Sequence, residues 1–183
     1  MTAPSGLRAF KRYITTHNEE GKAIFSNTLP PEPTWGNIGA AKVLLGYTTN
    51  SFPAKVGLDE EDVKAYDHNV KNPPGIVMSN GTVLRIVDMR PKHVSPMHRT
   101  VSLDYCCCLE GTAELVLDSG ESRILKRGDV VVERATMHLW RNVSDTEWVR
   151  MLYVLTPAEP VKVGDQLLGE DYGDMDASVP KST

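Results

Sequence analysis

The stretch that decides the fold begins with Pro96-Met97-His98-Arg99-Thr100-Val101-Ser102-Leu103-Asp104-Tyr105 and ends with His138-Leu139-Trp140-Arg141-Asn142. Between these two runs lie Leu109-Glu110-Gly111 and Gly128-Asp129, which predict turns. A hairpin in this order brings the imidazoles of His98 and His138 and the carboxylate of Asp104 toward one point inside a small β-barrel. Two imidazoles and a carboxylate with open positions suit a catalytic divalent metal ion. The sequence therefore predicts a metal site formed by these three residues.

Alternation along the first run supports this convergence. His98, Thr100 and Asp104 share parity, so on an extended strand their side chains face the same side. Cys106 continues on that face and Cys107 points away from it. Because adjacent residues of a strand point to opposite faces, the three consecutive cysteines do not form a disulfide framework. We expect them to be free thiols that pack as small hydrophobic side chains.

The strands expected around this stretch are short and separated by frequent turns. From residue 76 onward the sequence predicts strands over 82–89, 103–109, 112–117, 122–125, 130–133, 137–142 and 148–155. Asp118-Ser119-Gly120 is typical of a hairpin turn. Many short strands with such turns indicate an all-β sandwich or barrel.

The first part of the chain predicts a mixed extension. We expect a strand over 8–16 with a return arm over 22–26, a further strand over 41–48 and a helix over 59–67, whose first turn is acidic. The predicted organisation is an N-terminal extension, residues 1–75, packing on a barrel, residues 76–160, followed by a tail, residues 161–183, that is mobile from Gly169 or packs along the outside. The strand over 8–16 is expected to cover an exposed sheet edge, its own or a partner's, and so to form a homodimer.

Composition excludes several classes of partner. The 183 residues are 40% hydrophobic and 24% charged, as in a soluble globular protein. The net charge of −4 argues against a nucleic-acid surface. No apolar run approaches the ~20 residues that span a bilayer. Since Arg8, Lys11 and Arg12 follow the N-terminus without an apolar signal-peptide core, a cytoplasmic location is expected.

The motif order resembles that of a small, single-domain cupin. In the family's first motif, His98, Thr100, Asp104 and Gly111 occupy the register of H-x-H, E and G, and Gly128, His138 and Asn142 match the second motif. Thr100 stands where the family has a second histidine, and Asp104 stands where it has a glutamate. The surrounding pattern is similar to cupins encoded beside fungal secondary-metabolite genes. The resemblance implies a cupin-type double-stranded β-helix, a jelly-roll barrel, with an N-terminal strand extension and a short helix.

The resemblance also implies a function. We expect a metal-dependent enzyme that acts on a small polyketide-like or aromatic acid, as a lyase or decarboxylase in secondary metabolism. Its divalent metal ion, Zn, Fe, Mn or Ni, would be held by His98, Asp104 and His138, with Asp104 and His138 as the catalytic residues. One alternative is a non-heme iron dioxygenase that uses the same residues. Another is a metal-free barrel that binds a small molecule without transforming it.

Further residues are candidates for substrate binding. Thr100 and Cys106 share the face of Asp104, and Trp140 shares the face of His138, where it either stacks on an aromatic ligand or belongs to the core. Arg85 either binds a substrate carboxylate through its fork of donors or lies on the outer face of the sheet. Asp104 is either a metal ligand or a buried general base. His93 is either a surface residue or a replacement for the missing histidine ligand.

Overall fold

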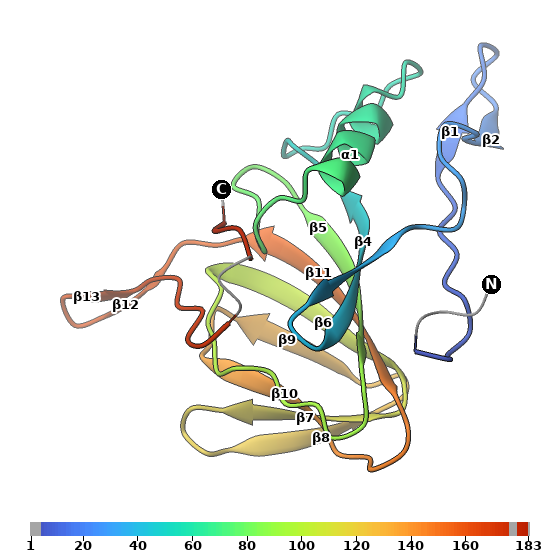
Figure 1. Cartoon of the computed structure of the whole chain (residues 1–183). Coiled ribbons are helices and arrows are strands. Elements are labelled where there is room, and N and C mark those ends of the chain that lie inside the picture. The colour runs from blue at the N-terminus through green and yellow to red at the C-terminus, as the bar shows by residue number, and fades with distance from the viewer. Residues whose placement is uncertain (1–4, 176–178, 183) are drawn as a thin grey trace.

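The computed structural model describes residues 5–175 and 179–182. Its main body consists of two antiparallel sheets that face each other (Figure 1). The larger sheet has the order β3-β4-β5-β11-β6-β9 and the smaller one β10-β7-β8. The elements are β1 Thr15–His17, β2 Ala23–Phe25, β3 Trp35–Ile38, β4 Ala41–Thr48, α1 Glu61–Lys71, β5 Val83–Met89, β6 Ser102–Glu110, β7 Thr112–Leu117, β8 Ser122–Lys126, β9 Val130–Arg134, β10 His138–Asn142, β11 Val149–Pro157, β12 Val161–Val163 and β13 Gln166–Leu168. The predicted all-β jelly-roll barrel with one short helix is confirmed.

Strict alternation on β6 determines which side chains enter the barrel. Asp104, Cys106 and Cys108 are buried, whereas Tyr105 is 47% exposed. The two buried cysteines pack in the apolar core between the sheets, with Trp140 and Met151 among their neighbours. All three cysteines are free thiols, as predicted.

The Glu110-Gly111 turn between β6 and β7 depends on glycine. Gly111 has a φ of +78°, and a Cβ at this position would lie 2.6 Å from the carbonyl oxygen of Trp148. A non-glycine residue would therefore be strained in both backbone and space. The turn reverses the chain between the two sheets, so β6 joins the larger sheet and β7 the smaller one.

The helix differs from the prediction at both ends. Glu60 has a left-handed φ of 52°, so the helix begins only at Glu61. It continues to Lys71, because the amide of Asn72 still donates to the carbonyl of His68 and Pro73 then stops the pattern. Tyr66 anchors the helix to the sheet, donating its hydroxyl proton to the Leu45 carbonyl at 2.8 Å.

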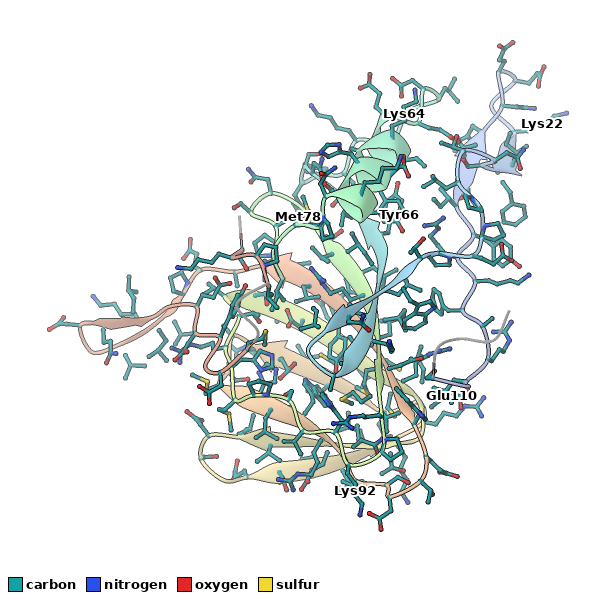
Figure 2. The ribbon with its side chains drawn as sticks, in the orientation of Figure 1. Lys22, Lys64, Tyr66, Met78, Lys92 and Glu110 are labelled. Atoms are coloured by element: carbon teal, nitrogen blue, oxygen red, sulfur yellow. The ribbon has the colours of Figure 1, made fainter. Side chains whose placement is uncertain are left out.

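The predicted strand over 8–16 is wrong for most of its length. Only Thr15–His17 is a strand, and it pairs with Ala23–Phe25 in a separate hairpin. In Figures 1 and 2 this hairpin, with Lys22 at its turn, stands away from the barrel. Within the described residues, β1 pairs with β2 alone. It covers no sheet edge of its own chain, and the homodimer stays a prediction.

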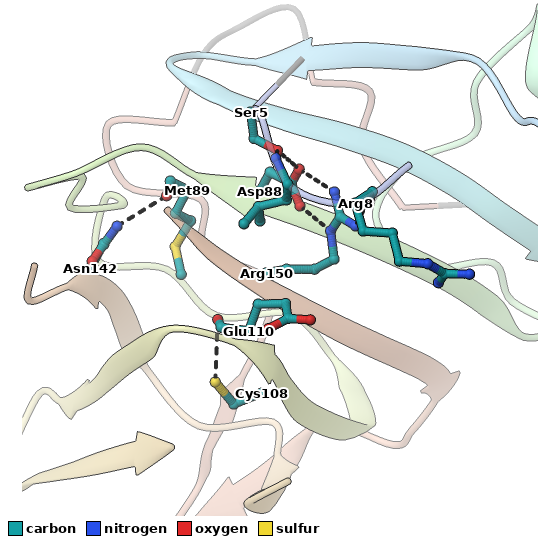
Figure 3. A network of polar contacts seen from close by, with 9 residues as sticks. Ser5, Arg8, Asp88, Met89, Cys108, Glu110, Asn142 and Arg150 are labelled. Carbon is teal, nitrogen blue, oxygen red and sulfur yellow. Dashed lines mark hydrogen bonds and ion pairs between the residues drawn. The ribbon is translucent and has the colours of Figure 1, made fainter. Parts of the chain in front are cut away.

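The N-terminal arm is instead fastened to the outer face of the larger sheet. There Asp88 on β5 receives two bonds of 2.6 Å from the guanidinium of Arg150 on β11. The Ser5 hydroxyl also donates to Asp88, and Arg150 donates to the carbonyl of Arg8 at 2.6 Å (Figure 3). The indole of Trp35 lies against the guanidinium, with the ring centroid 5.3 Å away. Ser5 and Arg8 thus contact the larger sheet, and the segment that follows them supplies β3 and β4 to that sheet.

The chain after the barrel returns to the barrel mouth. Residues 161–168 form a hairpin, β12–β13, that the sequence did not predict. Asp171 then exchanges backbone hydrogen bonds of 2.6 and 2.9 Å with Arg99, just before β6. Gly173, with a φ of +52°, packs so closely on the Met97 carbonyl that a Cβ would collide with it. This tail segment, residues 169–175, therefore lies at the mouth of the barrel, whereas the sequence predicted a tail that is mobile or packs along the outside. Residues 176–178 of the predicted tail lie outside the described residues.

The described part of the chain contains no helix that is long and apolar enough to cross a membrane.

Candidate functional site

A cavity of about 630 Å³ lies between the two sheets. Its wall includes all but one of the residues predicted for the site, together with several that were not predicted: Arg85, His93, His98, Thr100, Asp104, Glu133, His138, Trp140, Tyr153, Asp174 and Met175. Cys106 is absent from this wall and is buried beneath it. The volume is that of a site for one small organic molecule.

The two histidines are held together by the backbone. His98 and His138 form an antiparallel bridge with N–H···O distances of 2.8 and 2.9 Å, and their ring centroids lie 4.3 Å apart. Each Nδ1 is 2.9 Å from a backbone carbonyl, of Pro96 for His98 and of Thr136 for His138. A carbonyl can only accept, so each Nδ1 carries the proton and each Nε2 keeps a free lone pair.

Burial keeps both rings neutral. Desolvation, with the neighbouring His98 adding to it, lowers the pKa of His138 to about 4. Burial also lowers the pKa of His98. At neutral pH both side chains therefore offer a hydrogen-bond acceptor at Nε2.

Two carboxyl groups lie opposite each other on neighbouring strands. Asp104 of β6 is the register partner of Glu133 of β9, and each residue is only 4% exposed. Burial raises the pKa of Asp104 to about 6. Burial, with the charge of Asp104 adding to it, raises the pKa of Glu133 to about 8. At pH 7 the pair therefore holds one carboxylate and one carboxylic acid.

Glu133 connects the carboxyl pair to the histidines. Its Oε2 accepts from the Cys106 thiol at 3.3 Å, and its Oε1 lies 3.1 Å from His138 Nδ1. The proton on that nitrogen is directed at the Thr136 carbonyl, so Oε1 itself receives no hydrogen bond. Burial raises the pKa of Cys106 far above its usual value, with the carboxyl groups adding to the shift. This thiol is therefore not a nucleophile at neutral pH.

Buried polar atoms without a partner gather at this cavity. They are Arg85 Nε, Asp104 Oδ1, Glu133 Oε1 and Trp140 Nε1, and in the described chain only Arg12 and Glu170 have further such atoms. An unpaired buried polar atom costs free energy, so native structures contain few of them. Their concentration in one cavity indicates a surface built to receive a polar ligand.

Aromatic rings form the apolar part of the wall. Trp140 packs edge-on against Tyr153, with centroids 5.7 Å apart, and against His138 at 6.3 Å. Trp140 is only 4% exposed, so it belongs both to the core and to the cavity wall. Thr100 accepts a hydrogen bond from Ser102 at 2.9 Å.

Sequence reasoning missed Glu133 and Tyr153. The signal for Glu133 was an acidic residue in the otherwise apolar strand Val130–Arg134, where alternation places Val131 and Glu133 on the same face. His93, for which a surface position was one of two alternatives, lies on the cavity wall. Arg85 also lies on the wall, on the inner side of β5.

The donor set fits a metal ion only in part. The two Nε2 lone pairs are suitable, because histidine ligands commonly donate their other ring proton to a carbonyl. Glu133 lies on the Nδ1 side of His138, however, and Asp104 lies beside Glu133. Across residues 5–175 and 179–182, no three His, Cys, Asp or Glu side chains are arranged to hold a metal ion. The metal site at His98, Asp104 and His138 therefore stays a prediction.

Comparison with known proteins agrees with this architecture. The cupin domain model matches residues 85–155. The chain is 46% identical to the phomopsin biosynthesis cluster protein D of Diaporthe leptostromiformis over 89% of this chain and 86% of that protein. It is 42% identical to the oryzines biosynthesis cluster protein J of Aspergillus oryzae, over 90% and 92%, and 40% identical to the cupin-domain-containing oxidoreductase virC of Hypocrea virens, over 87% and 82%. With whole-length relatives at this identity and the two-sheet barrel described above, the chain belongs to the cupin family, as a small cupin similar to those of fungal biosynthesis clusters.

Proposed function

We propose that this protein is an enzyme of secondary metabolism that moves protons on a small molecule, as a lyase or decarboxylase. The observation that carries the proposal is the carboxyl pair, Asp104 and Glu133, with one unpartnered oxygen each in the cavity. Two carboxyl groups whose surroundings separate their pKa values are the usual basis for assigning an acid and a base.

The two carboxyl groups have different tasks at pH 7. Asp104, with a pKa of about 6, is largely ionised and accepts a proton from the substrate. Glu133, with a pKa of about 8, is largely protonated and donates its proton to a leaving group or to the carbon that has lost carbon dioxide. Both pKa values lie close to neutral pH, where acid–base catalysis is most efficient.

The histidines orient the substrate in this scheme. Neutral His98 and His138 present Nε2 as acceptors, which suits a phenol, enol or hydroxyl group of a polyketide-like molecule. Trp140 and Tyr153 supply an apolar wall against which an unsaturated ring can pack. The tail residues Asp174 and Met175 complete the wall at the mouth.

The experiment begins with the natural substrate. Extract from a fungal strain that lacks this gene is incubated with the purified protein in D₂O, and compounds that disappear are followed by mass spectrometry. We expect one acidic intermediate to be consumed without consumption of oxygen. A decarboxylase product has lost carbon dioxide and carries one deuterium at carbon, whereas a lyase product has lost a leaving group and gains no deuterium. A product that gains oxygen atoms would contradict the proposal, and binding without any turnover would favour the metal-free binding barrel instead.

The second candidate is a metal-dependent oxidoreductase. The two free Nε2 lone pairs favour it, and so does the name of the relative virC. A bound iron ion would supply redox chemistry, and His98, His138 and Asp104 are the residues that would hold it. Elemental analysis of protein purified without a histidine tag, together with an oxygen electrode, separates this candidate from the first.

A further inference from the structure

Arg85 is a half-buried cation that has no carboxylate partner among the described residues. It lies on the inner face of β5, where one terminal nitrogen donates to the Gly75 carbonyl at 2.7 Å. Its Nε is buried and has no partner, and no ion pair of Arg85 exists within the described residues. Burial lowers the pKa of the guanidinium to about 10, so it remains charged at neutral pH.

Among the residues that the structure describes, no acidic side chain forms an ion pair with Arg85. The titratable side chain that acts on it is Tyr172 in the tail segment. Burial raises the pKa of Tyr172 to about 12, so its hydroxyl is neutral at pH 7. An uncompensated buried charge is costly, and proteins normally keep one only where a partner or a ligand neutralises it.

The sheet register places Arg85 within reach of a ligand that also reaches the carboxyl pair. Arg85 is the partner of Tyr153 on β11, and Tyr153 is the partner of Cys106 on β6. Asp104 lies one inward position along β6 from Cys106. Neighbouring strands lie about 4.8 Å apart and each residue advances a strand by about 3.4 Å, so the backbones at Arg85 and Asp104 are separated by about 12 Å. Both side chains line the same cavity.

We propose that Arg85 binds the carboxylate of the substrate, which makes the substrate a small organic acid with an aromatic or similarly flat body. The guanidinium offers its fork of donors to the two carboxylate oxygens, and Trp140 adds an indole N–H that has no other partner. The placing of the reacting carbon near Asp104 and Glu133 rests on the function proposed above. The anion site itself does not depend on it.

Binding of two matched probes tests the proposal. 4-Fluorobenzoate and 4-fluorobenzamide have nearly the same shape and differ by one charge, and their binding is followed by ¹⁹F NMR at pH 7.5. We expect the protein to bind the benzoate roughly ten- to a hundredfold more tightly than the benzamide. Equal affinities, or no binding of the benzoate, would overturn the proposal without any variant being made.

Variants test whether Arg85 is the residue that causes the preference for the benzoate. Arg85→Gln should bind both probes equally weakly, whereas Arg134→Gln, which changes an exposed arginine of β9, should keep the full preference. Arg85→Lys keeps the charge and loses the fork of donors, so it should show a reduced preference for the benzoate. If Arg85→Gln does not fold, this variant tests the assignment in its place. A preference that survives Arg85→Gln, or that is lost with Arg134→Gln, would overturn the assignment.

Two further measurements locate the probe and separate the two proposals. Arg85 also borders a smaller cavity of about 350 Å³ that contains Trp35. Cross-relaxation from the probe's ring protons next to its carboxylate should reach the indole N–H of Trp140 and disappear in Trp140→Phe, whereas cross-relaxation to Trp35 would overturn the placement. Asp104→Asn should keep the preference for benzoate. If this variant loses turnover but still prefers benzoate, the anion site does not depend on the proposed reaction.

Discussion

The larger sheet carries two polar clusters on its opposite faces, and they differ in whether their buried polar atoms have partners. On the outer face, Asp88 and Arg150 satisfy each other, and Ser5 and the Arg8 carbonyl complete the network (Figure 3). On the inner face, Arg85 and the carboxyl groups of the cavity keep buried atoms without any partner. Both clusters use residues of β5, and both contain arginine and acidic side chains.

We infer that pairing, more than residue type or burial, separates a structural cluster from one that can bind a ligand. A closed ion pair holds the N-terminal arm in place and has nothing left to offer a ligand. The inner groups have been desolvated without compensation, so a ligand that pairs with them recovers part of that cost. Each of the following predictions tests this difference.

The largest expected effect is on turnover. Asp104→Asn and Glu133→Gln should each lower the rate by about 10²–10⁴-fold, because in the proposed function each side chain transfers a proton. Neither change should lower the melting temperature, since a neutral amide replaces an acid whose ionised form is disfavoured by burial. Rates are measured on the substrate found in the deletion extract. If a variant loses stability but keeps its rate, that carboxyl group stabilises the fold and does not take part in the reaction.

The next effect is on stability and should differ between the two arginines. Arg150→Met leaves Asp88 charged and unpaired, and should lower the free energy of unfolding by about 3–5 kcal/mol in urea titrations. Arg85→Met removes a cation that has no counter-ion among the described residues, and should change the free energy of unfolding by no more than about 1 kcal/mol. Combining Arg150→Met with Asp88→Leu should recover most of the loss. If Arg150→Met and Arg85→Met lower the free energy of unfolding equally, the proposed difference between the two faces of the sheet is wrong.

The raised pKa of Glu133 should make the free energy of unfolding depend on pH. A glutamate in the unfolded chain titrates near 4.5, and in the folded protein Glu133 titrates near 8, so the folded state binds its proton more tightly. That stabilisation is complete below pH 4.5 and is lost as the pH rises toward 8. His138, with its lowered pKa of about 4, acts in the opposite direction only between about 4 and 6.5.

Between pH 6.5 and 8 the free energy of unfolding should therefore fall by about 1–2 kcal/mol. Glu133→Gln should remove this slope, and the measurement is a series of urea titrations across the range. Stability that rises with pH over this window would contradict the raised pKa.

The smallest expected effect concerns the N-terminal arm. Ser5→Ala removes one hydrogen bond to Asp88, whose carboxylate keeps both bonds from Arg150. We expect a loss of about 1 kcal/mol in the free energy of unfolding, with unchanged turnover. Ser79→Ala, at an exposed position, provides the control. A change in turnover would show that the outer network influences the cavity.

The strands of the barrel and much of the site were predictable because alternation is a local signal. The strands over 41–48 and 112–117 agree with the structure at both ends. The inward positions of Asp104 and Trp140 follow from parity alone, and both are buried. The positions of His98 and His138 on one cavity wall followed in the same way.

What could not be predicted depends on contacts between distant segments. The pairing of Asp104 with Glu133 requires the β6–β9 register, which no local pattern specifies. The prediction of a strand over 8–16 was wrong because contacts with distant segments determine the conformation there. The amide of Arg12 donates to the Pro31 carbonyl at 2.8 Å, and its side chain donates to Tyr66 at 2.6 Å, so tertiary contacts take the place of a ladder.

The tail segment makes the size of the cavity partly independent of the barrel. Asp174 and Met175 belong to the wall, yet the segment that carries them is held by the Arg99–Asp171 backbone bridge and by the close packing of Gly173 on Met97. Neither contact is part of the sheets that face each other across the core. Substitutions or length changes after Gly173 can therefore enlarge, narrow or recharge the entrance while the strands and their register stay as they are. In this protein the entrance to the cavity can thus be altered without the cost of repacking the core.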